Sequence, residues 1–313
     1  MYIYHFAHIE LGVSILFHGL IFLSKNLIVF ILINPIEVLS SIPDKKNDIL
    51  IQILPVFVIN LIIIIGFLEA LLEMNIIKYK NSIITAVLLY SAAAANCFQI
   101  LFFYQKNNLF IDWMLVICIG FISLFEFILT IKIIKILEPV SLKLITAIST
   151  DTVILNAYLK RKLVKSLRLG ILALLLKRCL YFLTLSSEDL GNIFVKSLLA
   201  KHFLVISMIL NMIILISGVV ILLLLSINLD NESLSQRYCI LVFIGLSMCC
   251  NIILFIDKVI SSKFNFPTIN LSHFFMLIYY GYAFIVVMME MRTLNVGLKA
   301  FHTRQPNIML HKL

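Results

Sequence analysis

Long uninterrupted apolar runs are the feature that most limits what this chain can fold into. One of them, LVISMILNMIILISGVVILLLLS at 204–226, holds no charged residue. About twenty apolar residues are needed for a helix to cross the hydrocarbon of a bilayer. The runs are continuous and do not alternate every second residue, so helices are favoured over a β-barrel. The sequence therefore predicts an all-α membrane helix bundle.

The composition agrees with this class, because only 13% of the 313 residues are charged and 62% are hydrophobic. Soluble domains carry about a quarter charged residues. No internal repeat or linker divides the chain, so we expect a single membrane domain over 1–313, with the lipid bilayer as its surrounding partner. Seven runs are predicted to be spans, at 11–34, 49–74, 83–104, 110–136, 203–226, 238–257 and 270–290.

The basic stretch AYLKRKLVKSLRLGILALLLKRCLYF, at 157–182, decides the predicted topology. If 169–187 crossed the bilayer, Lys177 and Arg178 would be immersed together, at about 2.5–3.5 kcal/mol each on insertion scales. The leucines around the other cations recur as in a basic amphipathic helix. We therefore expect 137–202 to be a long cytosolic helical connection after the fourth span.

Sidedness follows from this segment, because cytoplasmic loops collect Lys and Arg. The amino terminus is then predicted to be cytosolic and the carboxyl terminus external, although four cations in the tail oppose that placement. Asn231, in the sequence Asn-Glu-Ser, becomes an external candidate for glycosylation, while the sequon at Asn270 becomes internal. An eight-span alternative exchanges these two sequons.

Several polar residues inside predicted spans are candidates for chemistry. Ionisable groups within spans often mark ion paths or proton relays. Glu69 is open between such a role and an ion pair with a lysine such as Lys78, whereas Glu126 lies deeper in its span. Asn96 and Gln99 follow four alanines, where close helix packing is the favoured interpretation.

The last predicted span carries Tyr279, Tyr280 and Tyr282, with His273 and Glu290 at its two ends. An aromatic cluster with a few polar groups suits a small organic ligand, and we take the three tyrosines and Glu126 as candidate ligand-binding residues. Helix packing with interfacial tyrosines is the alternative.

Motifs of enzymes are missing from the sequence: it has no HExxH, no GxSxG, no Walker loop and no glycine fingerprint. The six cysteines do not have metal-type spacing. The basic segment contains few aromatic residues, which makes membrane-surface retention a simpler account than nucleic-acid binding. We expect no enzyme activity, no cofactor, no metal and no nucleic-acid partner.

Two stretches, ILNAYLKRKL at 154–163 and SSEDLGNIFVKSLLAKHFLVIS at 186–207, together with the predicted topology, resemble the insect gustatory and odorant receptor family. The Thr-Tyr and Gln-Phe signature of the gustatory branch is not matched in the last predicted span. No pore or ligand residue is therefore carried over from the family. Asn156 and Leu159 match a Leu-Asn-x-x-Leu element of that family, and Asn192, Phe194, Leu198 and Leu199 match its Asn-x-Phe-x-x-x-Leu-Leu element.

The resemblance implies a chemosensory receptor for taste or odour that acts as a ligand-gated cation channel. Such a protein would be a homo- or hetero-oligomer, tetrameric in this family, in the plasma membrane. Two other functions stay open. One is a secondary transporter with a carboxylate relay through Glu69 or Glu126, and the other is a non-catalytic subunit of an endoplasmic-reticulum membrane complex.

Overall fold

The computed structural model of the chain is all-helical over the segments that it describes, and no strand occurs among them. The predicted all-α class is confirmed for these residues. The described residues are 61–72, 75–88, 109–146, 152–193, 198–227, 233–261 and 272–294, together with positions 13, 16, 17, 20, 21 and 24.

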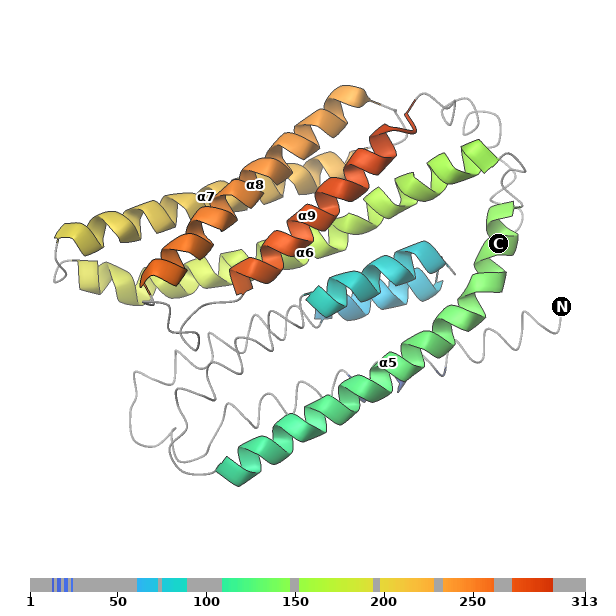
Figure 1. Cartoon of the computed structure of the whole chain (residues 1–313), viewed down its shortest axis with the longest axis horizontal. Helices are drawn as coiled ribbons and strands as arrows, with labels where there is room; N and C mark the ends of the chain where they lie inside the picture. The colour runs from blue at the N-terminus through green and yellow to red at the C-terminus, as the bar shows by residue number, and fades with distance from the viewer. Residues whose placement is uncertain are drawn as a thin grey trace.

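Within the described ranges from residue 61 onward, two short helices precede five longer ones in chain order. The short helices, Leu61–Leu72 and 76–88, are joined by a turn at Asn75 and are called the helical pair below. Figure 1 shows the helical pair between α5 on one side and α6 with α9 on the other. The longer helices are α5 (Leu109–Thr146), α6 (Thr152–Ile193), α7 (Leu198–Ser226), α8 (Leu234–Ser261) and α9 (Ser272–Met291).

Three of the described helices are long and apolar enough to cross a membrane: Val205–Ser226, Leu234–Asp257 and His273–Met291. They coincide with the last three predicted spans. Their outward faces carry large apolar side chains that are more than half exposed, as at Ile216 and Val242. A face of this kind suits lipid better than water. The chain therefore has the character of an integral membrane protein.

The earlier predicted spans are described only in part. The fourth, 110–136, lies within α5, and this helix continues ten residues beyond the predicted end. The second and third spans overlap the helical pair, which covers 61–72 and 76–88. Most of the first span lies outside the described residues.

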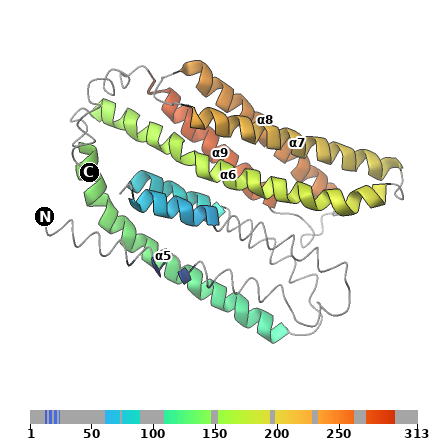
Figure 2. The same ribbon diagram turned by 180° about the vertical axis from the view of Figure 1, so that it is seen from behind.

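The segment predicted as a separate connection, 137–202, has a different place in the structure. Its central part forms α6, a helix of 42 residues, which at 1.5 Å per residue is about 63 Å long. This helix packs against α7 and α9, and the view from behind shows it lying along both (Figure 2). It is part of the bundle and does not stand apart from the candidate spans.

The sequence of α6 explains this position. Buried side chains recur every three or four residues, which makes one continuous stripe along the helix. Arg161 and Arg178 belong to this stripe, Lys177 is also buried, and Arg168 is exposed. The prediction weighed Lys177 and Arg178 as if both met lipid, whereas both are buried in the bundle. The stripe consists of Ala157, Arg161, Val164, Leu167, Ile171, Leu174 and Arg178.

Close contacts in the middle of α6 depend on glycine. Gly170 of α6 lies against the fully buried ring of Tyr279 from α9, and a Cβ atom at Gly170 would overlap the tyrosine hydroxyl. A Cβ atom at Gly218 of α7 would lie 3.0 Å from the Cγ atom of Leu175. Small residues at such points let helix backbones approach closely. The core of the molecule is therefore centred on α6.

Candidate functional site

Two groups of buried polar side chains lie inside the bundle formed by α6, α7, α8 and α9. The first, called the carboxylate cluster, consists of Arg161, Arg237 and Glu290, each no more than 3% exposed. Arg237 donates from Nε and Nη2 to the two carboxylate oxygens of Glu290, both at 3.0 Å. This two-bond geometry is the strongest form of arginine–carboxylate pairing. Arg161 Nε lies 3.6 Å from Glu290 Oε1, so the cluster joins α6, α8 and α9.

The second group, called the amide cluster, consists of Arg178, Asn211, Asn251 and His273, which come from four different helices. Arg178 donates Nη1 to the Oδ1 atom of Asn211 and Nη2 to the Oδ1 atom of Asn251. Its Nη2 atom also lies 3.1 Å from Nδ1 of His273. An arginine can only donate, so Nδ1 accepts and the neutral ring carries its proton on Nε2. All four side chains are buried.

The two asparagines of the amide cluster are held in orientation by their own helices. The Nδ2 atom of Asn211 donates to the Ser207 carbonyl oxygen at 2.8 Å, and Nδ2 of Asn251 donates to the Ser247 carbonyl oxygen at 2.8 Å. Each amide oxygen is therefore turned toward the guanidinium group. A buried charge is tolerated when its donors are matched in this way.

The two clusters are well separated along the bundle. Arg161 and Arg178 are 17 residues apart on α6, and Glu290 and His273 are 17 residues apart on α9. At 1.5 Å per residue the separation is about 25 Å. The layer between them is apolar and includes Ile171, Leu174, Tyr279, Ala283 and Val286.

Chemically, both clusters hold charge away from water at points where several helices meet. Ionisable residues inside membrane bundles pair with one another, and they often mark pathways or switch points. Each cluster also fixes the relative register of its helices, because a shift of one turn would leave a buried arginine without its acceptors. The two clusters are therefore the candidate functional site of the described region.

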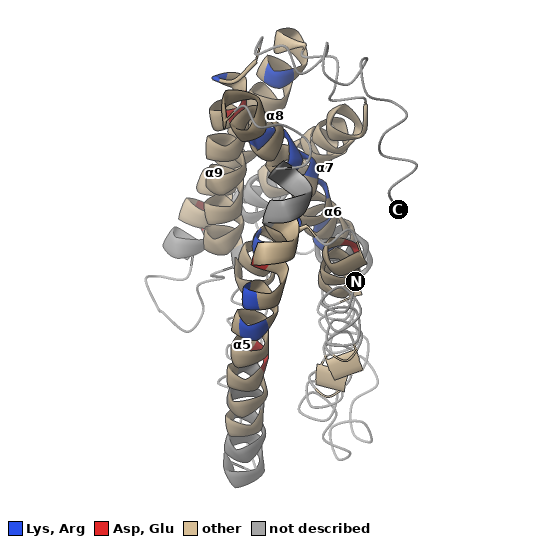
Figure 3. Ribbon diagram, turned by 90° about the vertical axis from the view of Figure 1, so that its right-hand side faces the viewer, with Lys and Arg blue, Asp and Glu red and all other residues tan. Residues whose placement is uncertain are grey.

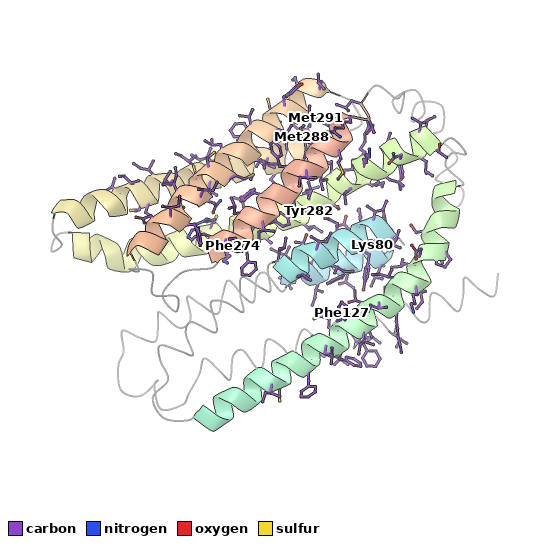
Figure 4. All side chains as sticks on the ribbon, viewed as in Figure 1. Lys80, Phe127, Phe274, Tyr282, Met288 and Met291 are labelled. Carbon is purple, nitrogen blue, oxygen red and sulfur yellow. The ribbon has the colours of Figure 1, made fainter. Side chains whose placement is uncertain are left out.

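The predicted ligand-binding residues are brought together only in part: the rings of Tyr279 and Tyr282 lie 6.3 Å apart, whereas Glu126 lies on another helix. Tyr279 and Tyr280 are at most 2% exposed in the bundle core, and the hydroxyl of Tyr282 donates to Asn81 Oδ1 at 2.6 Å. Figure 4 shows Tyr282 on the side of α9 that faces the helical pair. Glu126 is partly buried on α5, which the helical pair separates from α9 (Figures 1 and 2). Tyr279 and Tyr280 are thus packed in the bundle core, and Glu126 lies apart from the three tyrosines.

The other predicted polar residues have simpler positions. The carboxylate of Glu69 is 2.8 Å from the Lys78 ammonium group, and its side chain is 45% exposed. This is the ion pair that the sequence suggested as the alternative to a relay. Asn96, Gln99 and Asn231 lie outside the described residues.

Sequence reasoning missed most of the residues in the two clusters. His273 and Glu290 were noted at the ends of the last span, but their arginine partners were assigned to a cytosolic helix and to a loop. Asn211 and Asn251 carried a usable signal, since each is a lone amide inside an otherwise apolar run. A lone polar residue in a span usually faces the bundle interior.

Comparison of the chain with protein-family models, with curated proteins and with solved structures finds no match. No family is identified by these comparisons. The functional argument therefore rests on the residues and on their arrangement.

Proposed function

We propose that the chain is a subunit of a chemosensory membrane receptor that acts as a ligand-gated cation channel. The observation that carries the proposal is the resemblance of 154–163 and 186–207 to the insect gustatory and odorant receptors. The first stretch belongs to the beginning of α6, and the second runs from its end into α7. Both stretches thus belong to one antiparallel helix pair at the centre of the bundle.

The bundle offers a physical basis for gating. A ligand shifts a closed-to-open equilibrium only through different affinities for the two states. Clusters of buried hydrogen bonds permit few intermediate positions, because a partial shift leaves charged groups unsatisfied. A displacement of α9 against α6 would have to break both clusters together, which gives the bundle the two-state character that a gated channel needs.

The test is electrophysiological. The full chain, expressed at the cell surface and shown there by surface biotinylation, is exposed to a panel of sugars, bitter compounds and odorants. We expect a cation current for at least one compound class. Absence of current from surface-expressed protein across the panel, alone and with co-expressed receptor subunits, would contradict the proposal.

A second candidate, a proton-coupled secondary transporter, is favoured by the fully buried carboxylate of Glu290. Among the described residues it is a better relay candidate than Glu69, whose side chain is half exposed. This function predicts solute uptake driven by a pH gradient in proteoliposomes. Uptake would be lost in Glu290→Gln and in Glu126→Gln but kept in Glu138→Gln, since the Glu138 side chain is 53% exposed.

Location in the plasma membrane and a cytosolic amino terminus are part of the receptor proposal. Exclusive retention in the endoplasmic reticulum, read by the same biotinylation experiment, would instead favour a structural subunit of a membrane complex there. The seven-span arrangement also belongs to the resemblance, but the positions of the described helices favour a different number of crossings.

A further inference from the structure

One end of the bundle can be defined from contacts between the helices. The carboxylate cluster joins the first part of α6 to the start of α8 and the end of α9. The side chain of Gln236, at the start of α8, donates to the Leu224 carbonyl oxygen near the end of α7. These four helix ends therefore lie together, at what is called the basic end below.

The turn of the helical pair lies toward the same end. Asn81 donates to Ser166 of α6 at 2.6 Å and accepts from Tyr282 of α9. Earlier in that helix, the backbone N–H of Ile76 lies 3.4 Å from Ser141 Oγ near the end of α5. The turn at Asn75 and the last part of α5 are thus at the basic end as well.

The amide cluster defines the opposite end. It joins the later part of α6 to the first half of α7, the last part of α8 and the first turn of α9. The helix α6 consequently runs between the same two ends as the three candidate spans. It lies beside α9 from Glu290 to His273, and so along the whole of that span.

A helix that accompanies a membrane span over its full length has the same depth in the bilayer. If α7, α8 and α9 cross the membrane, α6 crosses with them. The strongest objection is its charge, but Arg161, Lys177 and Arg178 are buried in the bundle, and both arginines have partners there. Arg168, between the two clusters, is the exposed cation of this helix segment. Charged residues inside membrane bundles are found in such interior, paired positions.

We propose that α6 is a membrane-spanning helix, which gives the chain eight crossings and puts its amino and carboxyl termini on one side of the membrane. The crossings are α6 and the seven predicted spans. This inference does not rest on the receptor function. It replaces the seven-span topology that the resemblance implies.

Charge assigns the basic end to the cytosol. Figure 3 looks onto this end and shows Lys and Arg gathered on α5 and α6. Cytoplasmic segments of membrane proteins collect these residues. The sequence cations Lys299, Arg304 and Lys312 then also follow the rule, whereas the seven-span topology places them outside. Exposed cations of the described residues at this end are Lys80, Lys132, Lys135 and Arg292.

The experiment determines whether the full chain crosses the membrane an even or an odd number of times. The chain is made in the presence of microsomes with one epitope tag at each terminus, and protease is added outside the sealed vesicles. We expect both tags to be digested together. Digestion of the amino-terminal tag with protection of the carboxyl-terminal tag would overturn the proposal.

A matched pair of insertions and one double variant complete the test. A spacer carrying a glycosylation sequon should be modified when placed in 262–271 and unmodified in 227–232, and the reverse pattern would overturn the proposal.

If the cations alone kept α6 in the cytosol, Lys177→Leu/Arg178→Leu would move the carboxyl-terminal tag across the membrane. We expect no movement. Because these readouts require no ligand, they are independent of whether the receptor function holds.

Discussion

The carboxylate cluster and the amide cluster bury arginines from the same stripe of α6 in two different ways. Arg161 shares the carboxylate of Glu290 with Arg237, whereas Arg178 donates to the amide oxygens of Asn211 and Asn251 and contacts the imidazole of His273. The bundle therefore holds one pair of guanidinium groups against a carboxylate and another guanidinium group against amide oxygens. The two solutions should respond differently to mutation.

The largest effect is expected for Glu290→Ala. It leaves Arg161 and Arg237 buried near each other without the carboxylate, and breaking a buried ion pair in this way costs about 3–5 kcal/mol. The free energy of unfolding in lipid bicelles, measured by steric trapping, checks this value. Glu138→Ala is the control, because its contact with Lys80 at 3.7 Å is half exposed and should contribute less than about 1 kcal/mol. Equal losses in the two variants would contradict the account of the carboxylate cluster.

The layer between the clusters is tested by Gly170→Ala. The added methyl group overlaps the buried Tyr279 ring, and overpacking of this kind costs about 1–3 kcal/mol. Gly245→Ala in α8 is the matched control, since a Cβ atom there has no neighbour within 4 Å. The same unfolding measurement should separate the two variants. If Gly170→Ala were as stable as Gly245→Ala, the close approach of α6 and α9 would be refuted.

A smaller effect is expected for the contact between Arg178 and Asn251 in the amide cluster, because the amide of Asn251 is neutral. A double-mutant cycle of Arg178→Met and Asn251→Leu should give a coupling free energy of about 1 kcal/mol. The single Arg178→Met change leaves amide oxygens without their donor, and adding Asn251→Leu removes part of that cost. Additive losses would mean that these two residues do not interact.

The smallest effect is expected for Glu69→Gln. The ion pair with Lys78 is partly exposed, and pairs of this kind contribute about 0.2–1 kcal/mol. Unfolding at low and high salt should show a small loss that disappears as salt increases. A loss as large as that of Glu290→Ala would show that Glu69 is buried in the membrane-embedded protein.

Part of the fold could be predicted from the local pattern of the sequence. The apolar runs that became α7, α8 and α9 need no knowledge of their neighbours, because length and hydropathy alone identify them as candidate membrane spans. The ion pair of Glu69 with Lys78 is also local, since it joins residues nine positions apart across one turn.

The place of α6 could not be predicted in this way. Whether Arg178 can be buried depends on Asn211, Asn251 and His273, which are 33 to 95 residues away in the sequence. Insertion scales assign a free-energy cost of membrane insertion to each cation separately, so they take no account of hydrogen-bond or ion-pair partners from other helices. The same argument applies to Arg161 and Glu290. The burial of Tyr279 could not be predicted for a related reason, because the glycine that accommodates its ring lies on α6.

The central claim is that α6 lies inside the bundle against α7, and proximity in the membrane tests it most directly. In a chain without its native cysteines, Leu175→Cys is combined either with Gly218→Cys or with Ile216→Cys, whose position is 58% exposed on the outer face of α7. A short bifunctional thiol reagent is then added to native membranes. We predict efficient cross-linking within one chain for the Gly218 pair and little for the Ile216 pair. Failure of the Gly218 pair to cross-link, in protein whose single-cysteine variants both react with the reagent, would contradict the account.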